Sequence, residues 1–175
     1  MTSLQRTCSF ASALMMSAVL VVSNASADLK KIGKAGSWEI LGDSSSCQAT
    51  KALKGREIGQ FAIGITNKSE TFFTFQNLSW RGQTRTRKLP VNMALDNKMV
   101  LKARAINLMQ FGTLQIITSP TKPALWQNFL RAKTITISGK FNPGSATFRL
   151  DNPSRIVPLM KTCLARHLPG TAAPF

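Results

Sequence analysis

The side chains best able to do chemistry in this sequence are basic, and many of them gather in the middle of the chain. Lysine and arginine number 23 against 7 aspartate and glutamate, which gives the 175-residue chain a formal net charge of +16. Guanidinium and ammonium groups bind phosphate, sulfate and carboxylate through charge-assisted hydrogen bonds. We therefore predict an anion-binding patch, with Trp80 as a stacking surface, made of Arg81, Arg85, Arg87, Lys88, Lys98, Lys102 and Arg104.

The first part of this patch has a second interpretation. From Thr84 to Lys88 threonine and arginine alternate, which places Arg85 and Arg87 on one face of a strand. Exposed basic side chains on a strand also discourage edge-to-edge pairing. Taken alone, this segment favours a solvated strand face over an anion site. The charge of the whole chain nevertheless favours polyanionic surroundings.

Patterns typical of catalysis or metal binding are scarce. The acidic residues are scattered without paired spacing, so general acid–base catalysis has no evident pair. Zinc-ligand spacing, a phosphate-binding loop and a dinucleotide fingerprint are absent from the sequence. The Asp43-Ser44-Ser45-Ser46 cluster offers hydroxyl groups, but we interpret it as a turn. We expect no cofactor, no metal and no enzymatic activity. The alternative is an envelope hydrolase whose site the fold assembles from residues such as Asp43, Asp96 or His167.

The N-terminal segment has the form of a secretory signal peptide. Arg6 precedes an apolar run from Phe10 to Val22, and Ala25-Ser26-Ala27 fits the small-residue pattern of a cleavage site. The apolar run is shorter than the roughly 20 residues that a membrane-spanning helix needs. We therefore predict cleavage before Asp28, and a periplasmic or secreted mature protein with no transmembrane segment.

Export changes the interpretation of the three cysteines. Cys8 leaves with the signal peptide, so the mature chain keeps Cys47 and Cys163. Two cysteines in an oxidising compartment most simply form one disulfide, which here joins the start of the domain to its end. The alternative is a catalytic cysteine, because His167 follows Cys163 at helical spacing. We favour the disulfide.

Hydrophobic periodicity predicts a mainly β protein. The clearest hairpin joins residues 60–66 to residues 71–80, and other strands are expected at 37–41, 47–53, 84–89, 91–95, 99–105, 113–118, 133–138 and 146–150. Apolar residues at helical spacing predict one helix that starts at Pro123 and a C-terminal helix from Pro153 to His167. We expect a β-sandwich or open barrel of about ten short strands with these two helices.

The domain boundaries follow from the same patterns. Residues 1–27 are the signal peptide, 28–36 a loose N-terminal segment, 37–167 a single β-rich domain and 168–175 a flexible tail. Hydrophobic residues make up 43% of the chain, which is enough for a packed core.

Several features together resemble a known family. They are the early Trp38 and Cys47, the turn-separated strands, the late strand ITISGKF and a closing helix that carries Cys163. In size, signal peptide, β-rich pattern and cysteine use the chain resembles the invasion-associated locus B family of small exported alphaproteobacterial proteins. The resemblance implies a periplasmic or surface protein linked to virulence and host-cell entry, without known catalysis.

The sequence therefore predicts a non-enzymatic exported protein that binds a partner protein or an anionic polymer. For an exported protein the anionic candidates are lipopolysaccharide, membrane phospholipid and host glycosaminoglycan. Nucleic acid binds the same charge without specificity, and export makes it a poor physiological partner.

The predicted disulfide has a direct chemical test. When the unreduced mature protein is denatured and treated with iodoacetamide, mass spectrometry should detect no alkylation at Cys47 or Cys163. Prior reduction should expose both thiols to the reagent. Alkylation of both cysteines without reduction would contradict the disulfide.

Overall fold

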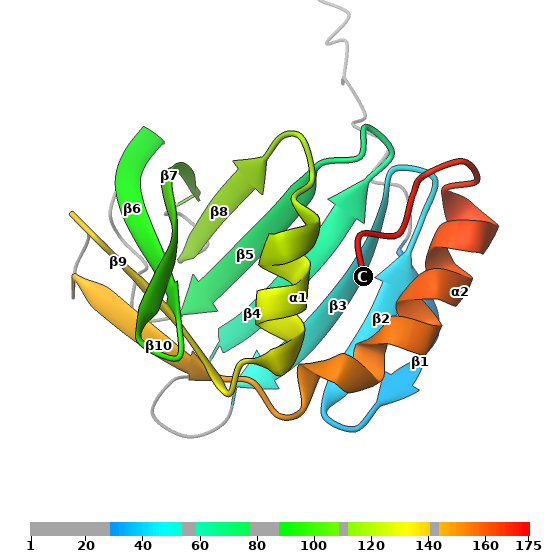
Figure 1. The fold of residues 1–175 in the computed structure, drawn as a ribbon, viewed down its shortest axis with the longest axis horizontal. Coiled ribbons are helices and arrows are strands. Elements are labelled where there is room, and N and C mark those ends of the chain that lie inside the picture. Colours follow the sequence, from blue (N-terminus) through cyan, green and yellow to red (C-terminus); the bar gives the residue numbers. More distant parts are fainter. Residues whose placement is uncertain (1–28, 54–58, 78–87, 109–111, 141–143) are drawn as a thin grey trace, which may run out of the picture.

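The computed structural model describes residues 29–53, 59–77, 88–108, 112–140 and 144–175. Within these ranges ten antiparallel strands form one sheet, in the order β1-β2-β3-β4-β5-β8-β7-β6-β9-β10, as Figure 1 shows. The strands are β1 (Lys30–Ala35), β2 (Trp38–Gly42), β3 (Ser46–Leu53), β4 (Gly59–Thr66), β5 (Thr71–Asn77), β6 (Lys88–Leu95), β7 (Lys98–Leu108), β8 (Thr113–Thr118), β9 (Thr134–Gly139) and β10 (Ser145–Arg149). The mainly β prediction is confirmed.

Alternating side chains build the core of the sheet. In β4 the inward positions Phe61, Ile63 and Ile65 are fully buried. Phe61 lies opposite Phe75 of β5, and Ile63 opposite Phe73, so two inward faces meet in register. Cross-strand aromatic and β-branched pairs of this kind stabilise antiparallel sheets. This is the hairpin that the sequence predicted most clearly.

The sheet then folds back over itself. We call β1 to β5 with β8 the first leaf, and β6, β7, β9 and β10 the second leaf. Phe148 of β10 packs against Phe75 and Phe61 of the first leaf, with ring centroids 5.4 and 6.4 Å apart. Both leaves therefore turn their apolar faces toward one core.

Three polar contacts, made by Trp38 and Lys51, hold the end of β10 on the first leaf. The indole Nε1 of Trp38 donates a hydrogen bond to the backbone oxygen of Asp151 over 2.9 Å. The ammonium of Lys51 lies 2.7 Å from the Asp151 carboxylate and also donates to the backbone oxygen of Arg149. Because Lys51 is only 7% exposed, these acceptors supply the partners that a buried ammonium requires.

Helix α1 (Pro123–Arg131) lies against the same apolar face of the sheet, in front of β4 and β5 in Figure 1. Its buried residues are Leu125, Trp126 and Phe129. The Phe129 ring packs at 6.0 Å from both Trp38 and Phe61, and Trp126 Nε1 donates to Thr71 Oγ1 over 2.8 Å. The helix begins with proline at its first position, as predicted.

The C-terminal helix covers the other end of the first leaf. A 3₁₀ turn, η3 (Pro153–Ile156), leads into α2 (Val157–His167), which contacts β1, β2 and β3. Cys163 of α2 forms a disulfide with Cys47 of β3, with the two Cα atoms 5.9 Å apart, so the predicted cross-link is confirmed. Gly42 admits this contact, because a Cβ built there would lie 2.3 Å from Cys163 Sγ.

The structure differs from the sequence prediction at three segments. Residues 28–36 were expected to be loose, but they contain strand β1, which pairs with β2. Residues 84–89 and 91–95 were expected as two strands, but β6 runs without interruption from Lys88, and residues 84–87 lie outside the described chain. The segment 168–175, expected to be a flexible tail, packs on the domain. Leu168 is buried in the core and the Phe175 ring lies 5.1 Å from Trp126.

The predicted signal peptide, residues 1–27, lies outside the described chain. In the part of the chain that the structure describes, no helix is long and apolar enough to cross a membrane.

We predict that Gly42→Ala is far more destabilising than Gly33→Ala. The Gly42 methyl would meet a disulfide sulfur that cannot move aside, whereas the Gly33 methyl would meet the flexible end of Leu159 at 3.2 Å. Overpacking of a rigid site should lower the free energy of unfolding by about 3 kcal/mol, and Gly33→Ala by about 1 kcal/mol or less. Urea unfolding measures both. Equal losses would contradict the close packing of α2 on β2.

Candidate binding surfaces

Three cations share the outer side of the second leaf. In the β6–β7 pair Lys88 lies opposite Ile106, and Arg104 opposite Pro90, two residues further along β6. Directly opposed residues point to the same side of an antiparallel pair, and so do residues two apart on one strand. Lys88, Arg104 and Lys102 therefore point to one side, and all three are exposed. We call these three residues the basic face.

The local sequence explains why the cations face solvent. Between them the inward positions Leu89, Val91 and Met93 of β6 belong to the core or pack against it. A strand with one buried side must place its intervening residues outward. The charged positions of β7 alternate with Leu101 and Ala103 in the same way.

The structure places part of the predicted anion patch. Lys98 is exposed at the first position of β7, beside the turn that follows β6. Together with the basic face it accounts for four of the seven predicted cations. Trp80, Arg81, Arg85 and Arg87 lie outside the described residues.

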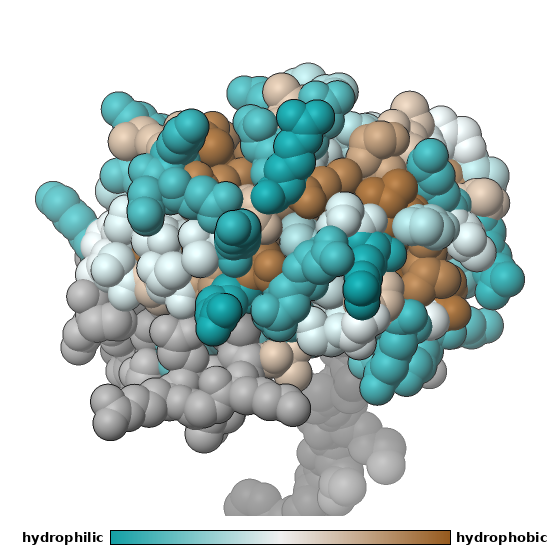
Figure 2. Space-filling model, turned by 60° about the horizontal axis from the view of Figure 1, so that its bottom comes forward, coloured by the Kyte–Doolittle hydropathy of each residue, from teal (hydrophilic) through white to brown (hydrophobic). Residues whose placement is uncertain are grey.

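Acidic side chains do not neutralise the basic face. In the described chain the ion pairs are Lys31 with Glu39 and Lys51 with Asp151. The hydrogen bond from the partner lysine lowers the pKa of each of these two carboxyl groups. Figure 2 shows one side of the molecule, where hydrophilic side chains cover much of the surface and apolar patches lie between them.

Two further carboxylates are used to hold turns. Asp43 Oδ1 accepts hydrogen bonds from Ser45 N, Ser45 Oγ and Ser46 N at 2.7 to 2.8 Å, which confirms the predicted turn. Burial raises the pKa of Asp43, but the hydrogen bonds from the two serines outweigh it and the pKa is lowered. Asp96 Oδ1 accepts from Thr134 N at 2.8 Å and Lys133 N at 2.9 Å, and the Thr134 amide is the main cause of its lowered pKa.

The residues of the hydrolase alternative come together only in part. His167 lies near Asp43 and helps to lower the pKa of that carboxyl group, whereas Asp96 lies on the second leaf. The Ser45 hydroxyl donates to Asp43 rather than to His167. The hydrogen bond between nucleophile and base that characterises hydrolytic triads is thus not formed among these residues. Cys163 is held in the disulfide, and the described residues contain no cluster of potential metal ligands.

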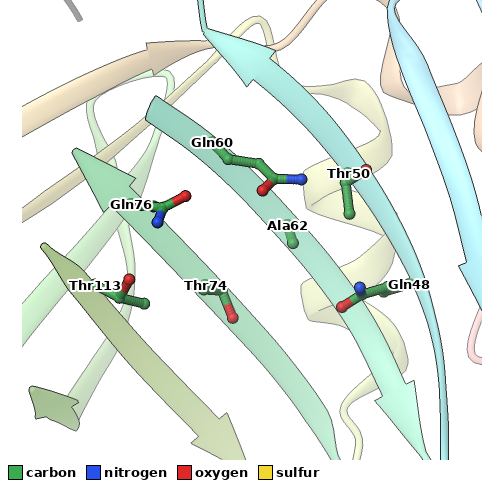
Figure 3. Close-up of a pocket in the computed structure, with 7 residues that line it drawn as sticks. All are labelled: Gln48, Thr50, Gln60, Ala62, Thr74, Gln76 and Thr113. Carbon is green, nitrogen blue, oxygen red and sulfur yellow. The ribbon is translucent and has the colours of Figure 1, made fainter. Parts of the chain in front are cut away.

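A second surface is uncharged, and the sequence analysis missed it. It lies on the side of the first leaf that faces away from α1, as Figure 3 shows. A hollow of about 190 Å³ is lined by Gln48, Thr50, Gln60, Ala62, Thr74, Gln76 and Thr113. A neighbouring hollow of about 380 Å³ shares Gln48 and Thr74 and adds Lys68 at the hairpin. The sequence pattern that could have predicted this surface is the recurrence of glutamine and threonine at alternate positions of adjacent strands.

Next to this surface a glycine makes room for an aromatic ring on the outer side of the sheet. Gly64 of β4 lies opposite Phe72 of β5, and a Cβ built on Gly64 would lie 2.3 Å from the Phe72 ring. The ring therefore lies over the glycine and is almost fully buried on the outer side of the sheet. The outer side thus has a part on the first leaf that is lined mainly by glutamine and threonine, and a basic part on the second leaf.

Comparison with protein-family models, curated proteins and solved structures finds no match for this chain.

We predict that Asp96→Asn makes acid destabilisation less steep. A carboxyl group with a lowered folded-state pKa contributes stability above its usual value of 3.8, and this stability is lost as the pH falls through the lower folded-state pKa. In thermal melts between pH 6 and pH 2.5, the melting temperature of the variant should fall less than that of the wild type. At pH 6 the variant should already melt at a lower temperature than the wild type.

The matched control is Glu70→Gln, because the Glu70 carboxylate has no hydrogen-bond or ion-pair partner among the described residues. It should leave the pH profile unchanged. If the melting temperature of Asp96→Asn fell with pH as steeply as that of the wild type, the Asp96 carboxylate would not link the β6–β7 turn to β9.

Proposed function

We propose that this protein is an exported, non-enzymatic binding protein that holds an anionic polymer of the cell envelope or the host surface on its basic face. The observation that carries the proposal is the convergence of Lys88, Lys102 and Arg104 on one side of β6 and β7, without an acidic partner among the described residues. Such an uncompensated cluster attracts anions and accelerates their encounter.

The proposed ligand is a chain of anionic groups rather than a single ion. The three cations are spread over two strands, so that successive phosphates or sulfates of one polymer reach different side chains. Because all three side chains are exposed, a single small anion there remains hydrated and screened by salt. Lipopolysaccharide, a phospholipid surface and glycosaminoglycan share the required chemistry.

Export to the periplasm or the cell exterior supports this choice of ligand. The N-terminal sequence is typical of a signal peptide, and the Cys47–Cys163 disulfide is the kind of bond that persists in oxidising compartments. The resemblance to the invasion-associated locus B family links the proposal to host-cell entry.

The test is salt-dependent retention of the mature protein on immobilised heparin and on lipopolysaccharide. We predict that the variant Lys88→Glu/Lys102→Glu/Arg104→Glu elutes at markedly lower salt than the wild type. If each cation contacts one anionic group, the slope of log affinity against log salt should decrease by about three.

The matched control removes the same charge from another surface. Arg155→Glu/Lys161→Glu/Arg166→Glu changes exposed positions of η3 and α2. Its retention should decrease much less. Equal effects of the two triple variants would show that net charge, and not the basic face, causes binding. Wild-type retention no better than that of a neutral protein would refute the proposal.

A further inference from the structure

Strands β7 and β8 form a hairpin whose ladder stops early. The pairs are Leu108 with Thr113, Asn107 with Leu114 and Ile106 with Gln115. The same register would next pair Ala105 with Ile116 and Arg104 with Ile117, but the two strands separate there (Figure 1). The separation occurs in the middle of the sheet, away from its two outer edges.

The fold itself causes the separation. β7 is paired with β6 from Lys98 to Ile106, with one irregularity in register, and β6 belongs to the second leaf that folds over the core. β8 stays paired with β5 from Thr113 to Thr118 and so remains in the first leaf. Each strand follows its other neighbour, and an opening forms between the leaves.

This opening leaves a stretch of backbone without a ladder. From Lys98 to Ala105 the side of β7 that faces β8 forms no backbone hydrogen bond with any described residue. Unpaired amide and carbonyl groups along a strand are a template for a further strand. The stretch is eight residues long, which is longer than a typical strand.

The two outer edges of the sheet are less suitable for a further strand. β1 contains an irregularity in register between Lys31 and Gly33, and β10 is only five residues long. Bulges and short strands are common means by which proteins block edge pairing. The unpaired part of β7 has an irregularity only at its first residues, next to Met93 and Ala94 of β6.

The side chains beside the opening indicate what kind of strand fits. Met99 of β7 is 58% exposed and Ile117 of β8 is 41% exposed, and they are two of the three large hydrophobic residues that are exposed in the described chain. Lys102 and Arg104 of β7 are exposed between them. Met99, Lys102, Arg104 and Ile117 lie on the outer side, whereas Leu101 and Ala103 of β7 point inward and pack against the core. A strand that alternates acidic and apolar residues would place its acidic residues outward beside Lys102 and Arg104 and its apolar residues inward beside Leu101 and Ala103, because residues opposed across a ladder share a side.

A second copy of this chain does not fit the opening as well. Pairing of two β7 edges would bring Lys98, Lys102 and Arg104 against the same cations of the other molecule, and like charges directly opposite each other destabilise a ladder. We propose that the Lys98–Ala105 edge of β7 binds an extended acidic segment of a partner protein, which adds to the sheet as an antiparallel strand between the leaves.

This inference does not rest on polymer binding by the basic face, because it requires backbone pairing and not charge alone. The probe that separates the two is a fluorescein-labelled peptide with four Val-Glu repeats. Its control has four Pro-Glu repeats, which carry the same charge but lack the proline N–H groups that a ladder needs. Fluorescence anisotropy with the mature protein should show binding of the Val-Glu peptide that is at least about tenfold tighter.

Protein variants provide the second half of the test. Lys102→Glu/Arg104→Glu should weaken binding of the Val-Glu peptide at least about tenfold, and Lys133→Glu/Lys140→Glu, which changes exposed positions flanking β9, should weaken it less than about twofold. Circular dichroism checks that both variants are folded.

Equal affinities for the two peptides overturn strand addition even if heparin retention persists. Loss of heparin retention with intact peptide binding overturns only the polymer proposal. Concentration-dependent dimerisation of the free protein through β7 would favour a second copy and also overturn the proposal.

Discussion

The end of β10 is fixed on the first leaf by a small polar cluster, and the rest of the architecture depends on this constraint. Trp38 and Lys51 are adjacent inward positions on β2 and β3 that lie opposite each other in register, and both donate to the chain around Asp151. Burial of a lysine ammonium group costs free energy of desolvation unless hydrogen-bond acceptors surround it. Here the carboxylate of Asp151 and the carbonyl of Arg149 provide them. Because these acceptors come from the second leaf, the burial of Lys51 requires the sheet to fold back, and the aromatic rings of Phe148, Phe61 and Phe129 then fill the space between the leaves.

Folding back has consequences for both candidate binding surfaces. It separates the outer side of the sheet into two parts, of which one carries glutamine and threonine and the other carries Lys88, Lys102 and Arg104. It also draws β7 away from β8 and leaves an unpaired edge beside those cations. The charge and the open backbone thus lie on the same leaf for one geometric reason. The two proposals use these features separately: charge for an anionic chain, and the open backbone for an extended peptide.

Local patterns made much of the fold predictable. The hairpin of β4 and β5 follows from alternating apolar residues, α1 from an apolar stripe after Pro123, and the disulfide from the two cysteines that remain after the predicted signal peptide. The remaining features depend on contacts between distant residues. In β1 three of the six residues are exposed, the other three are half-buried and the register is irregular, so no alternation marks the strand. Phe175 has no local pattern that indicates its contact with Trp126. The basic face was predicted only in part, because alternation in β6 and β7 decides which cations meet and this required the register.

Hydrogen exchange of the β7 amides in the free protein tests the central claim most directly. If the leaves separate as described, amides from Lys98 to Ala105 that point to β6 are protected, whereas those that point toward β8 exchange at rates close to those of exposed backbone. The expected result, measured by NMR at single-residue resolution, is alternation of slow and fast amides in this stretch, and protection of those amides from Ile106 to Leu108 that point to β8. Uniform protection from Lys98 to Leu108 would contradict the open edge and, with it, the separation of the two leaves.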